Sequence, residues 1–188
     1  MAEKSLSMQI IEAIEKEDSR TILKLFKENP EQRSVHTFMG GQSWLGYASQ
    51  IGKLEAVKML VKLGVDVNLG DKNYGSRPIC SAADNGHYDL VEFLINNGTK
   101  LDVSESVRNA LFAAIVGRDP RIVKLLLEAG IDSKVVYNSK TMKNMDAIAF
   151  SLLNGELECA QIIALWNAGG DEQEAKLLLD KADKVAGN

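Results

Sequence analysis

The sequence is poor in cysteine, histidine, proline and aromatic residues. Its 188 residues include 2 cysteines, 2 histidines and 3 prolines, and 6% are aromatic. It contains no Cys-x-x-Cys or His-x-x-x-His spacing of the kind that binds metals, no glycine-rich phosphate loop and no nucleophile elbow. We therefore expect no catalytic residues, no cofactor and no bound metal, and an enzyme is the least favoured class of function.

A surplus of positive charge is also missing. The chain has 22 Lys and Arg against 26 Asp and Glu, which gives a net charge of −4. A protein that binds the phosphate backbone of a nucleic acid needs a basic face. The charge therefore argues against direct nucleic-acid binding and favours a basic partner protein.

Long hydrophobic runs are absent as well. The first residues, MAEKSLSMQIIEAIEKED, reach acidic positions before an apolar run attains the length of a signal-peptide core, and no later run approaches a membrane span. We expect a cytoplasmic protein that does not bind membranes. Cys80 and Cys159 are expected to be buried free thiols that act as small apolar groups.

What the sequence does contain is a repeat. The segment 41–68, GQSWLGYASQIGKLEAVKMLVKLGVDVN, returns in altered form at 75–102 as GSRPICSAADNGHYDLVEFLINNGTKLD. Three glycines of the first segment are each followed by another glycine 34 positions later, in the pairs Gly41 and Gly75, Gly52 and Gly86, and Gly64 and Gly98. Three equal spacings indicate a repeated structural unit.

Both segments resemble the ankyrin repeat, whose pattern G-x-T-P-L-H-x-A-A-x-x-G-H-x-x-V-V-x-L-L-L-x-x-G-A-D-V-N can be laid over them. The residues 43–46, SWLG, and 77–80, RPIC, stand at the T-P-L-H positions, and Ala82 and Ala83 stand at the alanine pair. The resemblance implies an all-α fold, an ankyrin-repeat solenoid of about five helix-turn-helix units with a C-terminal capping helix. We expect one domain over residues 1–188, with units at approximately 7–30, 41–68, 75–102, 104–132 and 142–169 and the cap at 171–185.

The resemblance also implies where a partner would bind. In ankyrin stacks, partners meet the loop tips and the concave faces of the first helices, because the buried positions are committed to stacking. The candidate partner-binding residues at these positions are Gln42, Trp44, Gln50, Ile51, Asn73, Tyr74, Ser76, Asp84, Asn85, Ser104, Glu105, Val107, Ile115, Val116, Met142, Lys143, Met145, Leu153 and Asn154.

Aromatic and apolar members of this set are the most informative. Trp44 and Tyr74 are expected to act as aromatic anchors of the kind enriched at interfaces. A concave face without a partner has little reason to carry Ile115 or Val116. Two alternatives stay open: Ile115 and Val116 are tucked under a neighbouring loop, or Trp44 packs against the connection 31–40.

The ankyrin resemblance implies that the chain binds another protein and has no catalytic activity. Small chains of degenerate ankyrin repeats look like bacterial immunity proteins that neutralise a secreted toxin, so the leading hypothesis is an immunity protein that covers the active site of a basic toxin or effector domain. The alternative is a regulatory or host-directed adaptor that binds some other protein.

Overall fold

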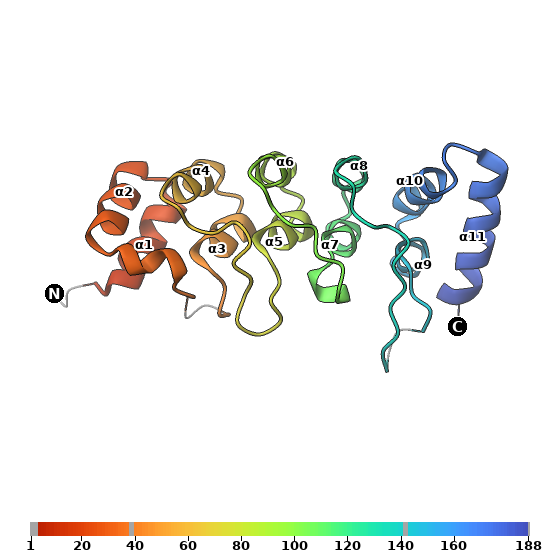
Figure 1. Cartoon of the computed structure of the whole chain (residues 1–188), viewed down its shortest axis with the longest axis horizontal. Helices are drawn as coiled ribbons and strands as arrows, with labels where there is room; N and C mark the ends of the chain where they lie inside the picture. The colour runs from red at the N-terminus through yellow and green to blue at the C-terminus, as the bar shows by residue number, and fades with distance from the viewer. Residues whose placement is uncertain (1–3, 38–39, 141–142, 188) are drawn as a thin grey trace. The chain divides into compact units, whose positions relative to one another are not determined.

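The computed structural model describes residues 4–37, 40–140 and 143–187, and the regular secondary structure in these ranges is entirely helical (Figure 1). Two isolated bridges, His36 with Ser43 and Tyr137 with Met145, are the only extended pairings there. The predicted all-α class is confirmed. Contacts divide the chain into two compact units, residues 1–100 and 101–188. The single domain predicted for residues 1–188 stays a prediction.

Helix pairs build both units. The first unit contains α1 (Leu6–Glu15), α2 (Ser19–Glu28), η1 (Pro30–Ser34), α3 (Trp44–Gln50), α4 (Leu54–Lys62), α5 (Pro78–Asp84) and α6 (Tyr88–Asn96). The second contains η2 (Ser106–Arg108), α7 (Ala110–Val116), α8 (Pro120–Glu128), α9 (Ala147–Leu153), α10 (Leu157–Asn167) and α11 (Glu172–Ala186). The last helix packs against α9 and α10, and the Asp171 carboxylate caps its first turn by accepting from the backbone N–H of Gln173 and Glu174.

Each described helix pair is joined by a turn that closes with the same hydrogen bond. A backbone N–H after the turn donates to the carbonyl oxygen five residues earlier, as in the Schellman motif. The donor and acceptor residues are Asp18 and Ala13 (2.9 Å), Lys53 and Ala48 (2.9 Å), His87 and Ala82 (2.9 Å), Asp119 and Ala114 (3.4 Å), and Glu156 and Ser151 (2.8 Å). Every acceptor residue is small and buried, so the first helix of each pair can lie close to its neighbours.

This hydrogen bond sets a register for α7 that differs by one residue from the one that glycine spacing gives. The glycine spacing equates Gly117 with Gly86, but the left-handed residue of the α7–α8 turn is Arg118, with φ +58°. Gly117 instead ends α7 in a right-handed conformation. The equivalent of Ala82 is therefore Ala114, and Ile115 falls at the buried position that Ala83 occupies in α5.

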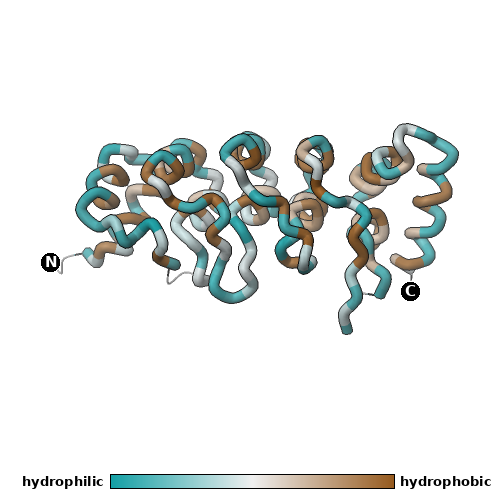
Figure 2. Tube along the Cα trace, viewed as in Figure 1, coloured by the Kyte–Doolittle hydropathy of each residue, from teal (hydrophilic) through white to brown (hydrophobic). Residues whose placement is uncertain are grey.

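The core of each unit consists of the apolar sides of its own helices. Hydrophobic and hydrophilic residues alternate along most helices (Figure 2), as expected for elements that bury one side. In the first unit α3 and α5 pack directly against each other, and Ala48, Ala82 and Ala83 are fully buried. In the second unit the Phe112 ring stacks on Phe150 with centroids 4.3 Å apart and meets the edge of Tyr137 at 5.1 Å.

A larger side chain at the buried alanine of α5 should destabilise the first unit. We expect Ala82→Leu to lower the free energy of unfolding by about 1–3 kcal/mol, because added methylenes in a closely packed site force neighbouring side chains and backbone apart. Chemical denaturation followed by circular dichroism measures this. Ala113→Leu is the matched control, since Ala113 is only half-buried and should cost less. Equal midpoints for Ala82→Leu and the parent would contradict the packing described here.

Candidate functional site

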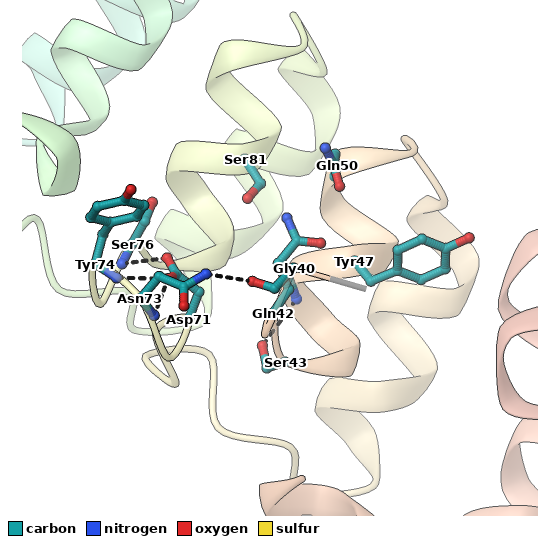
Figure 3. Close-up of a pocket in the computed structure, with 11 residues that line it drawn as sticks. Gly40, Gln42, Ser43, Tyr47, Gln50, Asp71, Asn73, Tyr74, Ser76 and Ser81 are labelled. Atoms are coloured by element: carbon teal, nitrogen blue, oxygen red, sulfur yellow. Dashed lines mark hydrogen bonds between the residues drawn. The ribbon is translucent and has the colours of Figure 1, made fainter. Parts of the chain in front are cut away.

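A groove of about 550 Å³ opens in the first unit beside α3 and α5. It brings together five of the predicted residues, namely Gln42, Gln50, Asn73, Tyr74 and Ser76. The remaining lining residues are Gly40, Ser43, Gly46, Tyr47, Asp71 and Ser81 (Figure 3). The walls thus come from α3 with its preceding turn, from Ser81 of α5, and from the loop at residues 71–76 that leads into α5.

The carboxylate of Asp71 holds this loop in one conformation. Its Oδ1 accepts hydrogen bonds from the backbone N–H of Asn73 and of Tyr74, both at 2.8 Å, and its Oδ2 accepts from the N–H of Ser76 at 2.9 Å (Figure 3). The backbone adds two bonds, from Gly75 N–H to the Asp71 carbonyl at 3.0 Å and from Asp71 N–H to the Ser76 carbonyl at 2.9 Å. Charge-assisted hydrogen bonds are stronger than neutral ones, so the loop is organised before any partner arrives.

The same loop is tied to the chain that precedes α3. Lys72 donates its backbone N–H to the Gly41 carbonyl at 3.0 Å, and the Asn73 side-chain amide donates to the Gly40 carbonyl at 3.1 Å. At the base of the loop, Gly70 passes so close to Gly75 that a Cβ would lie 2.4 Å from the Gly75 carbonyl oxygen. Only glycine fits there. The hydrogen bonds from Lys72 and Asn73 hold the two walls of the groove together.

The lining groups suit a protein partner. Gln42 and Gln50 carry amides, which both donate and accept hydrogen bonds, as peptide groups do. Tyr74 is 62% exposed beside them, and the Asp71 carboxylate fixes its backbone N–H. Tyr47 is buried, and its hydroxyl donates to Glu15 Oε1 at 2.8 Å; burial and the nearby Glu15 carboxylate raise the pKa of Tyr47 to about 12. It supports the wall and stays protonated at neutral pH.

Other predicted residues lie on the surface of their unit but outside the groove. Ile51 is half-buried in the α3–α4 turn, and Asp84 and Asn85 are exposed at the end of α5, where partial desolvation raises the pKa of the Asp84 carboxyl. In the second unit the exposed candidates are Ser104, Glu105, Val107, Val116, Lys143, Leu153 and Asn154. Met142 lies outside the described residues.

Three predicted surface residues are buried instead. Trp44 is 1% exposed, because it occupies the first position of α3, where Pro78 and Ala110 are also buried in α5 and α7. Its indole N–H donates to Gln32 Oε1 at 3.2 Å, within the connection that follows α2. This contact agrees with the alternative that Trp44 packs against the connection 31–40.

The other two buried residues lie in the second unit. Ile115 is fully buried because it occupies the position in α7 that the buried Ala83 occupies in α5, one residue away from the position that glycine spacing gives it. Val116 is the exposed residue at the end of α7. Met145 is 4% exposed, since its backbone exchanges two hydrogen bonds with Tyr137, at 2.8 and 3.0 Å. We therefore leave Trp44, Ile115 and Met145 out of any binding surface.

Sequence reasoning missed the residue that organises the groove. Asp71 begins the stretch DKNYG, and an aspartate followed by Asn and Gly is a signal for a turn in which the carboxylate accepts from the backbone. That signal was available. The contributions of Tyr47 and Ser81 depend on which helices meet, and a single sequence does not specify that.

Groups that could carry chemistry are scarce among the residues that the structure describes. No cluster of three or more His, Cys, Asp or Glu there could hold a metal ion. None of the described helices has the length and apolar character needed to cross a membrane. Cys80 and Cys159 are buried and neither is part of a disulfide, as predicted. Burial, followed by the charges of Glu156, Glu158 and Asp119, raises the pKa of Cys159 to about 11.

Removing the loop carboxylate should loosen the groove wall. We expect Asp71→Ala to cost about 1–3 kcal/mol of local stability, because three backbone N–H groups lose a charged acceptor. Hydrogen exchange should then speed up at the amides of Asn73, Tyr74 and Ser76. Asp66→Ala is the control, since that carboxylate accepts from the Asn68 N–H alone among the described bonds. Unchanged exchange at the three amides would refute the role given to Asp71.

The cysteines should be unreactive in the folded protein. Both thiols are buried, and Cys159, whose pKa is raised to about 11, is also protonated at neutral pH, whereas the thiolate is the reactive form. We expect no rapid reaction with Ellman's reagent at pH 7–8, and reaction of both thiols after unfolding in guanidinium chloride. A fast native reaction that Cys159→Ala removes would show that the burial described here is wrong.

Comparison with known proteins agrees with the helix pairs. A family model described as ankyrin repeats, in 3 copies, matches residues 10–105. The probable E3 ubiquitin-protein ligase XBOS32 of Oryza sativa subsp. japonica is 25% identical over 185 residues, which cover 82% of this chain and 37% of that protein. Ankyrin repeat and KH domain-containing protein mask-1 of Caenorhabditis elegans is 26% identical over 179 residues, covering 78% of this chain and 6% of that protein.

A shorter match is to ankyrin repeat and SOCS box protein 14 of Mus musculus, 29% identical over 97 residues that cover 49% of this chain and 16% of that protein. The chain therefore spans at most 37% of the length of these three relatives. Two of their names mention a KH domain or a SOCS box in addition to ankyrin repeats.

Proposed function

The chain belongs to the ankyrin-repeat family, and on that premise we propose that it binds a partner protein through the groove of its first unit, with Tyr74 as the central anchor. Ankyrin repeats are protein-interaction modules that generally have no catalytic role. The observation that carries the proposal is the combination of a largely exposed tyrosine and a loop fixed by Asp71.

A fixed loop favours binding because little ordering entropy remains to be lost. Immobilising a flexible side chain or loop at an interface costs free energy that preorganisation avoids. Tyrosine is enriched among the residues that dominate binding energy, since it offers a large contact area and a hydroxyl. The amides of Gln42 and Gln50 line the same groove. We infer that the occupant is a polar or extended segment whose peptide groups these amides can reach.

For the identity of the partner we propose a basic toxin or effector domain, neutralised when this protein covers its active site. The support is the net charge of −4, because a negative surface speeds the encounter with a basic partner and can mimic its nucleic-acid substrate. The alternative is a regulatory or host-directed adaptor. Gene neighbourhood separates the two, since an immunity gene lies beside its toxin gene.

The test of this role is co-expression with the product of the adjacent gene, followed by pull-down and an activity assay of that product. Formation of a complex together with inhibition would support immunity. A complex without inhibition would favour the adaptor. If the adjacent gene encodes no toxin and its product does not bind, the immunity proposal should be dropped.

Truncating the anchor should weaken binding without unfolding the protein. We expect Tyr74→Ala to cost about 2 kcal/mol or more in the free energy of binding, as for a central aromatic anchor, and to leave the melting temperature close to that of the parent. Isothermal titration calorimetry with the recovered partner measures the loss. Met8→Ala, which removes an exposed apolar side chain of α1 away from the groove, should bind as the parent does. Parent-like affinity for Tyr74→Ala would exclude the groove as the binding site.

A further inference from the structure

A second surface, in the second unit, carries apolar side chains that the core does not use. An open groove of about 570 Å³ is lined by Lys124 of α8, by Ile162, Leu165 and Trp166 of α10, and by Gly169 and Gly170 after it. Leu165 is 42% exposed and Trp166 is 48% exposed. Both lie on the second helix of a pair, away from the first helices and loop tips where the family resemblance places a partner.

The register of the helix pair explains why these side chains are outside. If the turns before α8 and α10 are aligned, Ile122 and Val123 match Cys159 and Ala160, and all four are buried. Leu165 then stands where α8 has the exposed Glu128, and Trp166 stands where α8 has its C-cap, Ala129. These are solvent positions of the repeat, so stacking does not require a leucine or a tryptophan there. Exposed apolar patches of this kind mark interaction sites.

The end of the groove is open to an incoming side chain. Gly169 and Gly170 both have positive φ, at +63° and +91°, and an added Cβ at either would find no atom within 4 Å. Their N–H groups donate to the carbonyls of Trp166 and Leu165, at 3.0 and 2.9 Å. The turn is therefore fixed by the backbone while its outer side stays uncovered.

The sequence of α10 and of the segments on either side of it is acidic. Residues 144–175 contain six Asp and Glu and no Lys or Arg. Glu158 lies one turn before Ile162 on the same side of α10, while Glu172 and Glu174 follow the glycines. None of these three carboxylates forms an ion pair with another residue that the structure describes. The one basic lining residue, Lys124, faces Glu128 of its own helix at 4.0 Å.

We propose that this surface binds a basic amphipathic segment of a partner protein. The apolar side of the segment lies in the groove against Leu165 and Trp166, and its Lys and Arg side chains face Glu158, Glu172 and Glu174. A polyanion or an anionic membrane has the wrong charge for this rim. A second copy of this chain would bring two sets of carboxylates together, which is unfavourable.

The probe for the test is an 18-residue amphipathic helical peptide of leucine and lysine without tryptophan. We expect it to bind the whole protein with an affinity that falls as salt rises, and to shift Trp166 emission to the blue. The chain has 2 tryptophans, and Trp44 is already buried, so the shift reports on Trp166. A scrambled peptide of the same composition and a leucine–glutamate peptide of the same pattern should bind more weakly.

Variants locate the binding. Leu165→Ser combined with Trp166→Ala should raise the Kd of the peptide by about 10-fold or more, measured by isothermal titration calorimetry because this variant lacks Trp166. The triple change Glu158→Gln, Glu172→Gln and Glu174→Gln should weaken it and reduce the salt dependence.

Matched controls are Val136→Ser, an apolar residue exposed to a similar extent outside the groove, and Glu92→Gln, an exposed carboxylate of the first unit. Tyr74→Ala should also bind the peptide as the parent does, so this test stands apart from that of the first groove.

Three results would overturn the proposal. The first is equal affinity for the scrambled or the leucine–glutamate peptide. The second is either that the parent does not bind the leucine–lysine peptide, or that the variants at Leu165 and Trp166 and at the three glutamates bind it as tightly as the parent. The third is a dimer seen by analytical ultracentrifugation that Leu165→Ser abolishes, since the occupant would then be a second copy of the chain.

Discussion

The hydrogen bond that closes each helix-turn-helix pair determines which residues are available for binding. It runs from the residue after the turn to a small, buried residue of the first helix, for example from His87 to Ala82. Because this bond fixes the two helices relative to each other, it also fixes which side chains point toward the neighbouring pair within the unit. The positions that remain outside are free to vary, and both surfaces discussed above occupy such positions.

The sequence predicted these turns well where glycine marks them. Gly52 and Gly86 have φ near +70°, as their equal spacing suggested. Glu17 has the same left-handed conformation in the turn between α1 and α2, with φ +52°, although it is not a glycine. The register from glycine spacing was wrong by one residue at Arg118, since an arginine can take the left-handed conformation at a modest cost when the closing hydrogen bond is kept. The nearby Gly117 misled the alignment.

The candidate site was predictable to the extent that it depends on register. Gln42, Gln50, Asn73, Tyr74 and Ser76 were selected by position in the repeat, and the structure brings them to one groove. The prediction was wrong where a residue was chosen for its type and not for its position in the repeat. Trp44 was chosen as an aromatic anchor, but the first position of α3 is a buried one. The groove itself depends on bonds between distant segments, such as Asn73 to Gly40, and no local pattern encodes those.

The two surfaces would recognise partners by different physics. The first offers hydrogen-bonding groups on a fixed loop, so its selectivity would come from geometry and would depend little on salt. The second offers apolar area on an acidic segment of the chain, so its attraction for a basic partner would fall with ionic strength. α10 is 11 residues long and α8 is 9, and Trp166 lies in the extra length. A two-residue extension beyond the repeat has therefore exposed a tryptophan without disturbing the buried positions Cys159, Ala160 and Ile163, because the closing turn lies at the other end of the helix.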